Sequence, residues 1–387
     1  MTGSPSRFQR FVLPGFAFKA VVIGGGYATG RELAEFFMPS GPRGGLLGML
    51  LAMAIWSAVC AATFAFARAA RAHDYLAFFK RLLGPAWPVF ELAYALLLVL
   101  ILAVFGAAAG AIGAALFGWP TLVGTLCLVA GIALFTTLGN VAVERLFKWV
   151  TFFLYGVYVL FVALALSRFG DQVAANLARP TPTTGWALGG LTYAGYNIIG
   201  AVVVLPVVRH MLCTRDAVVA GLLAGPLAML PALLFFVCMV AYYPQIAMQT
   251  LPSDFLLQRL DLPFFHLLFQ LMIFAALLES GTGAVNAINE RVSAAYRLRR
   301  ERVLPNAGRL AVAGVLLIGS IFIADHFGLV ALIARGYRAL AWIFLAVYVL
   351  PLMTWGLWLL WRGRVHPAAT VPPTSTAMPA SGNLPER

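Results

Sequence analysis

Gly24-Gly25-Gly26-Tyr27-Ala28-Thr29-Gly30-Arg31-Glu32 interrupts an otherwise apolar run, 11–37, near the start of the chain. Each of the three consecutive glycines costs a helix interior about 1 kcal/mol relative to alanine. Thr29 and Glu32 have the spacing of a capping box, which predicts that a new helix begins there. Lipid cannot satisfy free backbone groups, so non-helical backbone at membrane depth is buried in protein or lines a cavity. The stretch therefore predicts a broken membrane helix at a binding site.

The composition of the 387-residue chain predicts a multi-pass, all-α membrane protein. Hydrophobic residues make up 62% of the sequence and charged residues 11%, which leaves too few polar residues to cover a water-soluble surface. Crossing the hydrocarbon takes about 20 residues of helix. Ten apolar runs of suitable length are predicted as transmembrane helices: 11–37, 45–67, 88–117, 121–139, 149–167, 187–208, 217–243, 264–289, 309–324 and 338–361.

The basic residues of the loops predict the orientation. If the N-terminus is cytoplasmic, nineteen Lys and Arg residues lie in inside segments and six in outside loops. This asymmetry predicts that both ends of the chain are cytoplasmic. The net charge of +13 comes largely from these short loops, so the predicted partner is a lipid bilayer and nucleic acid is not predicted. The transmembrane domain is predicted over 1–364, and the Pro-, Ser- and Thr-rich segment 365–387 as a disordered cytoplasmic tail.

The sixth predicted span is also interrupted. If the ten spans are two inverted sets of five, about 11–167 and 187–361, this span is the counterpart of the first. It contains Gly195, Gly200 and Pro206, which weaken a helix, and Asn197, which can bond to nearby backbone. Interrupted segments at corresponding positions of two halves indicate a transporter binding site. An ordinary kink in the sixth span remains the alternative.

The eighth predicted span carries Glu279 about halfway along it, followed by Ser280 and Thr282. An ionisable residue at this depth costs at least about 2.5 kcal/mol and indicates a function. The two hydroxyls are of a kind that coordinates a small hard cation such as Na+, although hydrogen bonds between helices explain them equally well. The alternative for Glu279 is a structural charge pair with an arginine such as Arg31.

These clusters give the candidate site residues. Backbone N–H groups at the first break, together with the half-helix that begins near Gly30, favour an anionic group of the solute. Tyrosines of both interrupted spans can form aromatic walls. The residues predicted to bind the solute are Gly24, Gly25, Gly26, Tyr27, Thr29, Tyr193, Tyr196 and Asn197, and those predicted to couple an ion are Glu32, Glu279, Ser280 and Thr282.

Other chemistries find little support in the sequence. The four cysteines form no C-x-x-C pair, so no metal site is predicted. The sequence contains no H-E-x-x-H or G-x-S-x-G motif, so the chain is not predicted to be an enzyme. A solute sensor that uses the same cavity without transport remains open. The short cytoplasmic loops contain no evident signalling domain, which favours transport. The sequence does not indicate an oligomeric state.

The first break resembles a known motif. The run 24–32, followed by Phe36-Phe37, is similar to the G-x-G-[FY]-x-[ST]-G-x-E motif of the YkvI-type bacterial membrane proteins, and Tyr196-Asn197, Val204-Leu205-Pro206 and Glu290-Arg291 also agree. The resemblance implies membership of the amino acid, polyamine and organocation superfamily and its LeuT-like fold of five plus five spans. It implies a secondary transporter in the bacterial inner membrane, for which we expect a small solute such as an amino acid or other carboxylate and coupling to H+ or Na+, with no other cofactor. Arg31 departs from the family pattern, where an uncharged polar residue such as glutamine is expected.

Overall fold

The computed structural model describes residues 5–365 except 24, 139, 301 and 303, and all the regular structure in these residues is helical. The prediction for Gly24 and the predicted disorder after residue 365 lie outside the described residues. The longer helices are α1 (Leu13–Val22), α4 (Gly41–Ala70), α5 (Tyr75–Leu83), α6 (Trp87–Phe117), α7 (Thr121–Leu138), α8 (Asn140–Ala178), α9 (Trp186–Asn197), α11 (Thr214–Val240), α12 (Pro252–Leu260), α13 (Pro263–Arg300) and α14 (Asn306–Ala331).

Shorter helical segments lie at the interruptions and connections. The α-helical ones are α2 (Gly25–Ala28), α3 (Arg31–Phe36), α10 (Gly200–Val203), α15 (Arg338–Phe344) and α16 (Leu357–Trp361). The 3-10 segments are η2 (Met38–Ser40), η3 (Gly84–Ala86), η4 (Leu205–His210) and η5 (Gln245–Met248). The π-helical segments are η1 (Phe8–Val12), η6 (Leu332–Tyr337), η7 (Leu345–Val349) and η8 (Leu352–Gly356).

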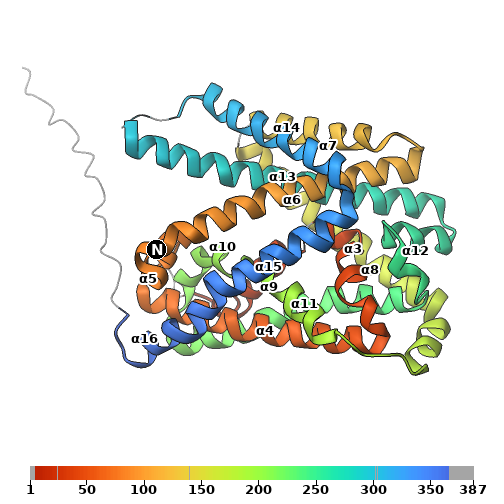
Figure 1. The fold of residues 1–387 in the computed structure, drawn as a ribbon, viewed down its shortest axis with the longest axis horizontal. Helices are drawn as coiled ribbons and strands as arrows, with labels where there is room; N and C mark the ends of the chain where they lie inside the picture. Colours follow the sequence, from red (N-terminus) through yellow and green to blue (C-terminus); the bar gives the residue numbers. More distant parts are fainter. Residues whose placement is uncertain (1–4, 24, 139, 301, 303, 366–387) are drawn as a thin grey trace, which may run out of the picture.

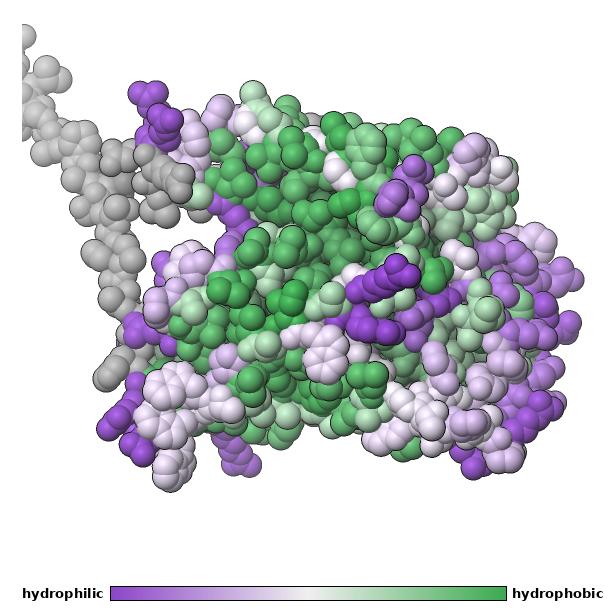
Figure 2. All heavy atoms as spheres, in the orientation of Figure 1, coloured by the Kyte–Doolittle hydropathy of each residue, from purple (hydrophilic) through white to green (hydrophobic). Residues whose placement is uncertain are grey.

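The exterior of the helical bundle is that of a membrane protein. A broad apolar belt separates polar atoms at the two ends of the long axis (Figure 2). By length and apolarity, six helical stretches among the described residues are able to span a membrane, and 121–136 is a shorter apolar helix. The predicted first and sixth spans are broken into pieces too short for this criterion, and the predicted ninth and tenth fall within the single stretch 306–361. The count of ten spans therefore stays a prediction.

The long helices pack into two groups (Figure 1). In one group, α11 packs against both α1 and α4, and α4 also packs against α9. In the other, α6 packs against α7, α13 and α14. Small residues allow the closest approach in the first group, because a side chain at Gly221 of α11 would overlap the backbone of Ala61 in α4. α2 packs against α6 and α13 of the second group, and α3 packs against α9 of the first, so the elements that carry many of the predicted site residues lie where the two groups meet.

Candidate functional site

The helix break predicted in the first span is present in the backbone. α1 ends at Val22, and Ile23 leaves the helical region with φ −78° and ψ 73°. After the single turn of α2, Gly30 adopts a left-handed conformation with φ 76°, and α3 begins. Glycine suits this position because a Cβ is strained at positive φ. The first span is therefore divided into α1, one isolated turn and the short helix α3.

The capping box predicted for Thr29 and Glu32 is wrong. Gly30, rather than Thr29, is the N-cap of α3, and no side chain caps this helix. Thr29 Oγ1 instead accepts a hydrogen bond from the Arg31 amide at 3.3 Å. The left-handed turn at Gly30 moves the helix start by one residue, so the Thr29 and Glu32 side chains no longer have the cap geometry. Glu32 is thereby available for a tertiary contact.

The sixth span is interrupted more mildly than the first. α9 ends at Asn197 and α10 begins at Gly200, while the residues between them keep right-handed helical angles. The amides of Ala201 and Val202 bond to carbonyls three residues back, at 2.9 and 3.1 Å, so the helix tightens here. Asn197 Nδ2 donates to the carbonyl of Tyr193 at 3.2 Å, as the sequence predicted for a local backbone bond. The interruption therefore redirects the helix without unwinding it.

The two interrupted spans are in direct contact. α1 packs against α10, and a Cβ on Gly200 would lie 3.0 Å from the ring of Phe18 and 3.3 Å from the side chain of Val21. A larger residue at position 200 would therefore push the two spans apart. This close approach places the end of α1 beside the end of α9.

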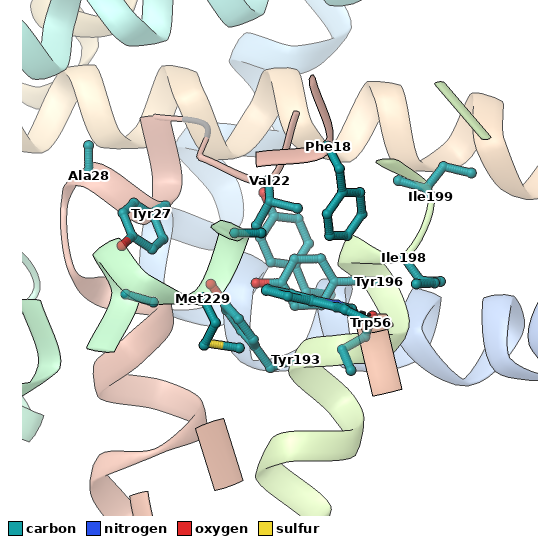
Figure 3. Packing of buried hydrophobic residues seen from close by; sticks show 14 of the residues in the cluster. Phe18, Val22, Tyr27, Ala28, Trp56, Tyr193, Tyr196, Ile198, Ile199 and Met229 are labelled. Atoms are coloured by element: carbon teal, nitrogen blue, oxygen red, sulfur yellow. Dashed lines mark hydrogen bonds between the residues drawn. The ribbon is translucent and has the colours of Figure 1, made fainter. Parts of the chain in front are cut away.

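Aromatic side chains from several elements surround the junction between the two interrupted spans. The ring of Tyr193 lies 4.9 Å from that of Phe37, 5.5 Å from Trp56 and 5.7 Å from Tyr196, measured between ring centres. Tyr196 in turn stacks on Tyr337, with centres 4.4 Å apart and planes 18° apart. Figure 3 shows Trp56, Tyr193 and Tyr196 packed together next to α1. The cluster joins the first, second and sixth predicted spans to the end of η6.

Glu32 contributes a carboxyl group to the junction between the two interrupted spans. Its side chain is buried, and the Tyr196 hydroxyl donates to Glu32 Oε2 at 2.5 Å. A cavity of about 70 Å³ lies beside this pair. Residues of four parts of the chain line it: Val21, Val22, Glu32, Leu97, Ile101, Phe105, Tyr196, Asn197, Ile199 and Tyr337. Because a water molecule occupies about 30 Å³ of liquid, this volume suits a small head group or two waters.

A second network ties the first break to the loop before α13. The guanidinium of Arg31 donates to the carbonyls of Ala247 and Gln249, both at 2.9 Å, and pairs with Glu35 at 2.7 Å. The Ser253 amide donates to the carbonyl of Thr29 at 3.0 Å. Arg31 is therefore held by its own helix turn and by this loop. The alternative in which it pairs with Glu279 is not found in the described structure.

The structure brings together only part of the set predicted to bind the solute. Tyr196 and Asn197 line the cavity, and Tyr193 packs directly beside Tyr196. Glu32, which was predicted to couple an ion, lines the same cavity. Tyr27 is buried outside the cavity lining. Thr29 is also buried outside this lining, and the surroundings of the predicted residues Gly25 and Gly26 in α2 are not described.

The predicted ion-coupling residues of the eighth span lie outside the lining of the cavity beside Glu32. Glu279 is partly exposed, and neither it nor Ser280 lines the cavity beside Glu32. The hydroxyl of Thr282 donates to the carbonyl of Leu278 at 2.7 Å, one turn back in the same helix. α13 nevertheless packs against α2, so the helix that carries this cluster contacts the first break.

Sequence reasoning missed three residues of this region. Tyr337 and Trp56 gave no sequence signal, because an aromatic residue in or next to an apolar span is ordinary until its neighbours are known. Lys19 did give one, since it is an ionisable residue within the first apolar run. In the structure Lys19 Nζ lies 4.3 Å from the ring centre of Tyr155 on α8. This cation–π contact holds a charged group in α1, shortly before the first break.

Comparisons with solved structures support the fold. MhsT, in complex with L-phenylalanine, is 16% identical and superposes with a TM-score of 0.59, covering 94% of this chain and 97% of that one. A manganese transporter from Eremococcus coleocola is 17% identical, with a TM-score of 0.56 and coverage of 94% and 86%. Mhp1 in its inward-facing conformation is 16% identical, with a TM-score of 0.54 and coverage of 90% and 79%.

These likenesses concern architecture. At identities of 16–17% they show a shared fold and leave the solute open. No protein-family model and no curated protein matches the sequence, so the relation to the YkvI-type proteins remains a resemblance. The chain is a multi-pass membrane protein with the LeuT-like fold.

Proposed function

We propose that this protein is a secondary active transporter of a small solute in the bacterial inner membrane. The observation that carries the proposal is the cavity beside Glu32 and Tyr196, which lies where two interrupted helices meet. In transporters built from repeated halves, discontinuous helices form the substrate site near the middle of the membrane. One of the solved structures with the same fold is described as a manganese transporter, which supports the same role here.

An amino acid is the solute class that we propose first. MhsT binds L-phenylalanine on the same architecture. The tyrosine-rich walls here supply both apolar faces and hydroxyl groups, which suit a solute with a polar end and an apolar body.

For the coupling ion we propose H+ or Na+. A proton would bind a buried carboxylate, for which Glu32 and Glu279 are the candidates. A sodium ion would use oxygen ligands near the first break together with Ser280 and Thr282. The Thr282 hydroxyl still has acceptor capacity after donating to its own helix.

A ligand screen followed by transport measurement tests the proposed function. Purified protein is heated with amino acids, organic acids, amines and nucleobases, with and without Na+. A ligand at one hundred times its dissociation constant should add about 2.7 kcal/mol of stability. Each hit is then tested for uptake into reconstituted vesicles. Uptake that follows an imposed gradient supports the transporter, whereas binding without uptake would instead establish a solute sensor.

A further inference from the structure

We infer that Glu32 recognises a protonated amine of the solute, so that the site requires a positive charge rather than a carboxylate. The inference rests on the proposed solute site and names its chemistry. Among the described residues that line the cavity, Glu32 carries the one charged group. Its exposure of 5% leaves little water to solvate that charge.

No cation of the described structure pairs with Glu32. The nearest arginine in sequence, Arg31, is engaged by Glu35 and by two loop carbonyls. Arg338, from the tenth predicted span, also approaches Glu35, at 3.5 Å. Two arginines thus share Glu35, while Glu32 has a hydroxyl as its partner. A buried carboxylate without a cation is costly unless a proton or a bound positive group compensates it.

The walls around Glu32 suit an ammonium group. Tyr196 and Tyr337 stack beside the cavity that both line, and aromatic rings attract cations through their faces. The Tyr193 hydroxyl is buried and has no hydrogen-bond partner among the described residues. An ammonium group has three donors. The Glu32 carboxylate is an acceptor in the cavity lining, and the Tyr193 hydroxyl is a further acceptor outside this lining, on the side chain that packs against Tyr196. The cavity volume of about 70 Å³ fits such a head group.

The same geometry disfavours an anionic head group at this place. α3 has only six residues, and Glu32 occupies its first turn. The positive end of this short helix therefore already faces a carboxylate of its own chain. A second carboxylate brought by a solute would meet like charge in a buried space, which costs binding free energy. The expectation of anion recognition at the start of this helix is therefore replaced by recognition of a cation.

The test compares three chemical forms of each probe. Glycine, alanine, leucine and phenylalanine are each used as the free amino acid, as the amide, which keeps the ammonium without the carboxylate, and as the N-acetyl acid, which keeps the carboxylate without the ammonium. Binding to the purified protein is measured by calorimetry and by thermal shift at pH 7. We expect at least one free amino acid and its amide to bind, and the matching N-acetyl acid to bind at least tenfold more weakly.

Variants assign the effect to Glu32. Glu32→Gln should weaken binding of the amide roughly thirtyfold or more, whereas Glu32→Asp, which keeps the charge, should retain part of the affinity. Glu290→Gln is the matched control, because the Glu290 side chain is 68% exposed and lies outside the cavity lining. Melting curves of all variants without ligand check that they fold. Calorimetric binding is repeated in two buffers of different ionisation enthalpy. The difference between the two binding enthalpies gives the number of protons released on binding, including any proton from Glu32.

Three outcomes would overturn the inference: preferential binding of N-acetyl acids, unchanged amide binding by Glu32→Gln, or no binding of any probe. The first would point to anion recognition, and the second to Glu32 as a proton carrier only. Failure of the proposed function is a different result, namely amine binding that depends on Glu32 without uptake into vesicles.

Discussion

Individual residues at the junction take roles that depend on partners far away in the sequence. Glu32 lies beside Arg31 in the chain, yet its hydrogen-bond donor is Tyr196, 164 residues away. Gly30 is equally specific, because its left-handed backbone makes the turn that separates α2 from α3. Single substitutions at these positions therefore test the site directly.

Removing the Tyr196 hydroxyl should destabilise the protein. In Tyr196→Phe, the buried Glu32 carboxylate loses its donor at 2.5 Å while the aromatic ring keeps its packing. Leaving a buried acceptor unsatisfied costs about 1–3 kcal/mol. Urea unfolding in a mild detergent would measure the loss. Tyr337→Phe is the control, because its ring stacks on Tyr196 without a hydrogen bond to Glu32. An equal loss in both variants would show that the Tyr196–Glu32 bond contributes nothing specific.

Gly30→Ala should also destabilise the protein. Its φ of 76° strains any residue with a Cβ, at about 1–3 kcal/mol, and a Cβ built there would lie 2.5 Å from the Phe235 ring. Gly170→Ala is the matched control within α8, where a Cβ meets nothing within 4 Å. That variant should be neutral or slightly more stable, because alanine favours a helix by about 1 kcal/mol. Thermal unfolding compares the two. A Gly30→Ala protein as stable as the control would disprove the strain argument.

At the scale of elements, the first span is held by a loop from the other half of the chain. Arg31 bonds to two carbonyls of the segment around η5, and the Ser253 amide at the start of α12 bonds to Thr29. The predicted orientation places this loop outside. The loop is therefore fastened to the break whose residues Val22 and Glu32 border the cavity.

Arg31→Gln should loosen this loop. The variant loses the ion pair with Glu35 and the paired donation to the carbonyls of Ala247 and Gln249. Hydrogen exchange, measured by mass spectrometry, should become faster in peptides covering 245–253 and stay unchanged in α4. Arg338→Gln is the control, because it removes a weaker contact to Glu35 at 3.5 Å and leaves the loop bonds in place. Equal exchange in the parent and in Arg31→Gln would show that the loop is held by other contacts.

Variants of the eighth predicted span distinguish H+ from Na+ as the coupling ion. If the proton is carried at Glu279, Glu279→Gln should abolish uptake driven by an imposed pH gradient and preserve exchange of solute. If Na+ binds near Ser280 and Thr282, Thr282→Val should weaken the dependence of uptake on Na+, because only the hydroxyl is lost. Uptake into vesicles with controlled gradients measures both. Glu279→Gln vesicles that respond fully to the pH gradient would exclude Glu279 as the proton carrier.

For the whole molecule, the cavity lies between the two helix groups. Val21, Val22, Tyr196 and Asn197 contribute from one group, and Leu97, Ile101 and Phe105 of α6 from the other. A cavity with walls on two separately packed groups changes size when the groups move relative to each other. The small volume in this structure therefore does not limit the solute to a head group.

Cysteine labelling in intact cells tests the orientation. We expect Met248→Cys to react with an impermeant thiol reagent and Arg297→Cys not to react, in a background without the four native cysteines. The structure decides the choice of probes, because Met248 is 84% exposed and Arg297 is exposed, whereas Ser253 and Ser293 on the same segments are buried. Labelling of Arg297→Cys alone would reverse the predicted orientation.

The sequence by itself determined the membrane class, the all-helical character and the positions of both interruptions. Apolar run length, glycine and proline act locally, so they can be interpreted without knowing the fold. Glu32 and Lys19 carried a sequence signal as ionisable residues in apolar runs, but that signal could not show what they contact.

Only the tertiary structure decided which partners the polar side chains of the site contact. It assigned Arg31 to Glu35 and the loop around η5, made Tyr196 the donor to Glu32, moved the helix cap to Gly30 and kept Glu279 out of the cavity lining. The physical reason is that a buried polar group takes whichever partner the packing of distant helices brings within hydrogen-bond distance, and local spacing carries no information about that packing.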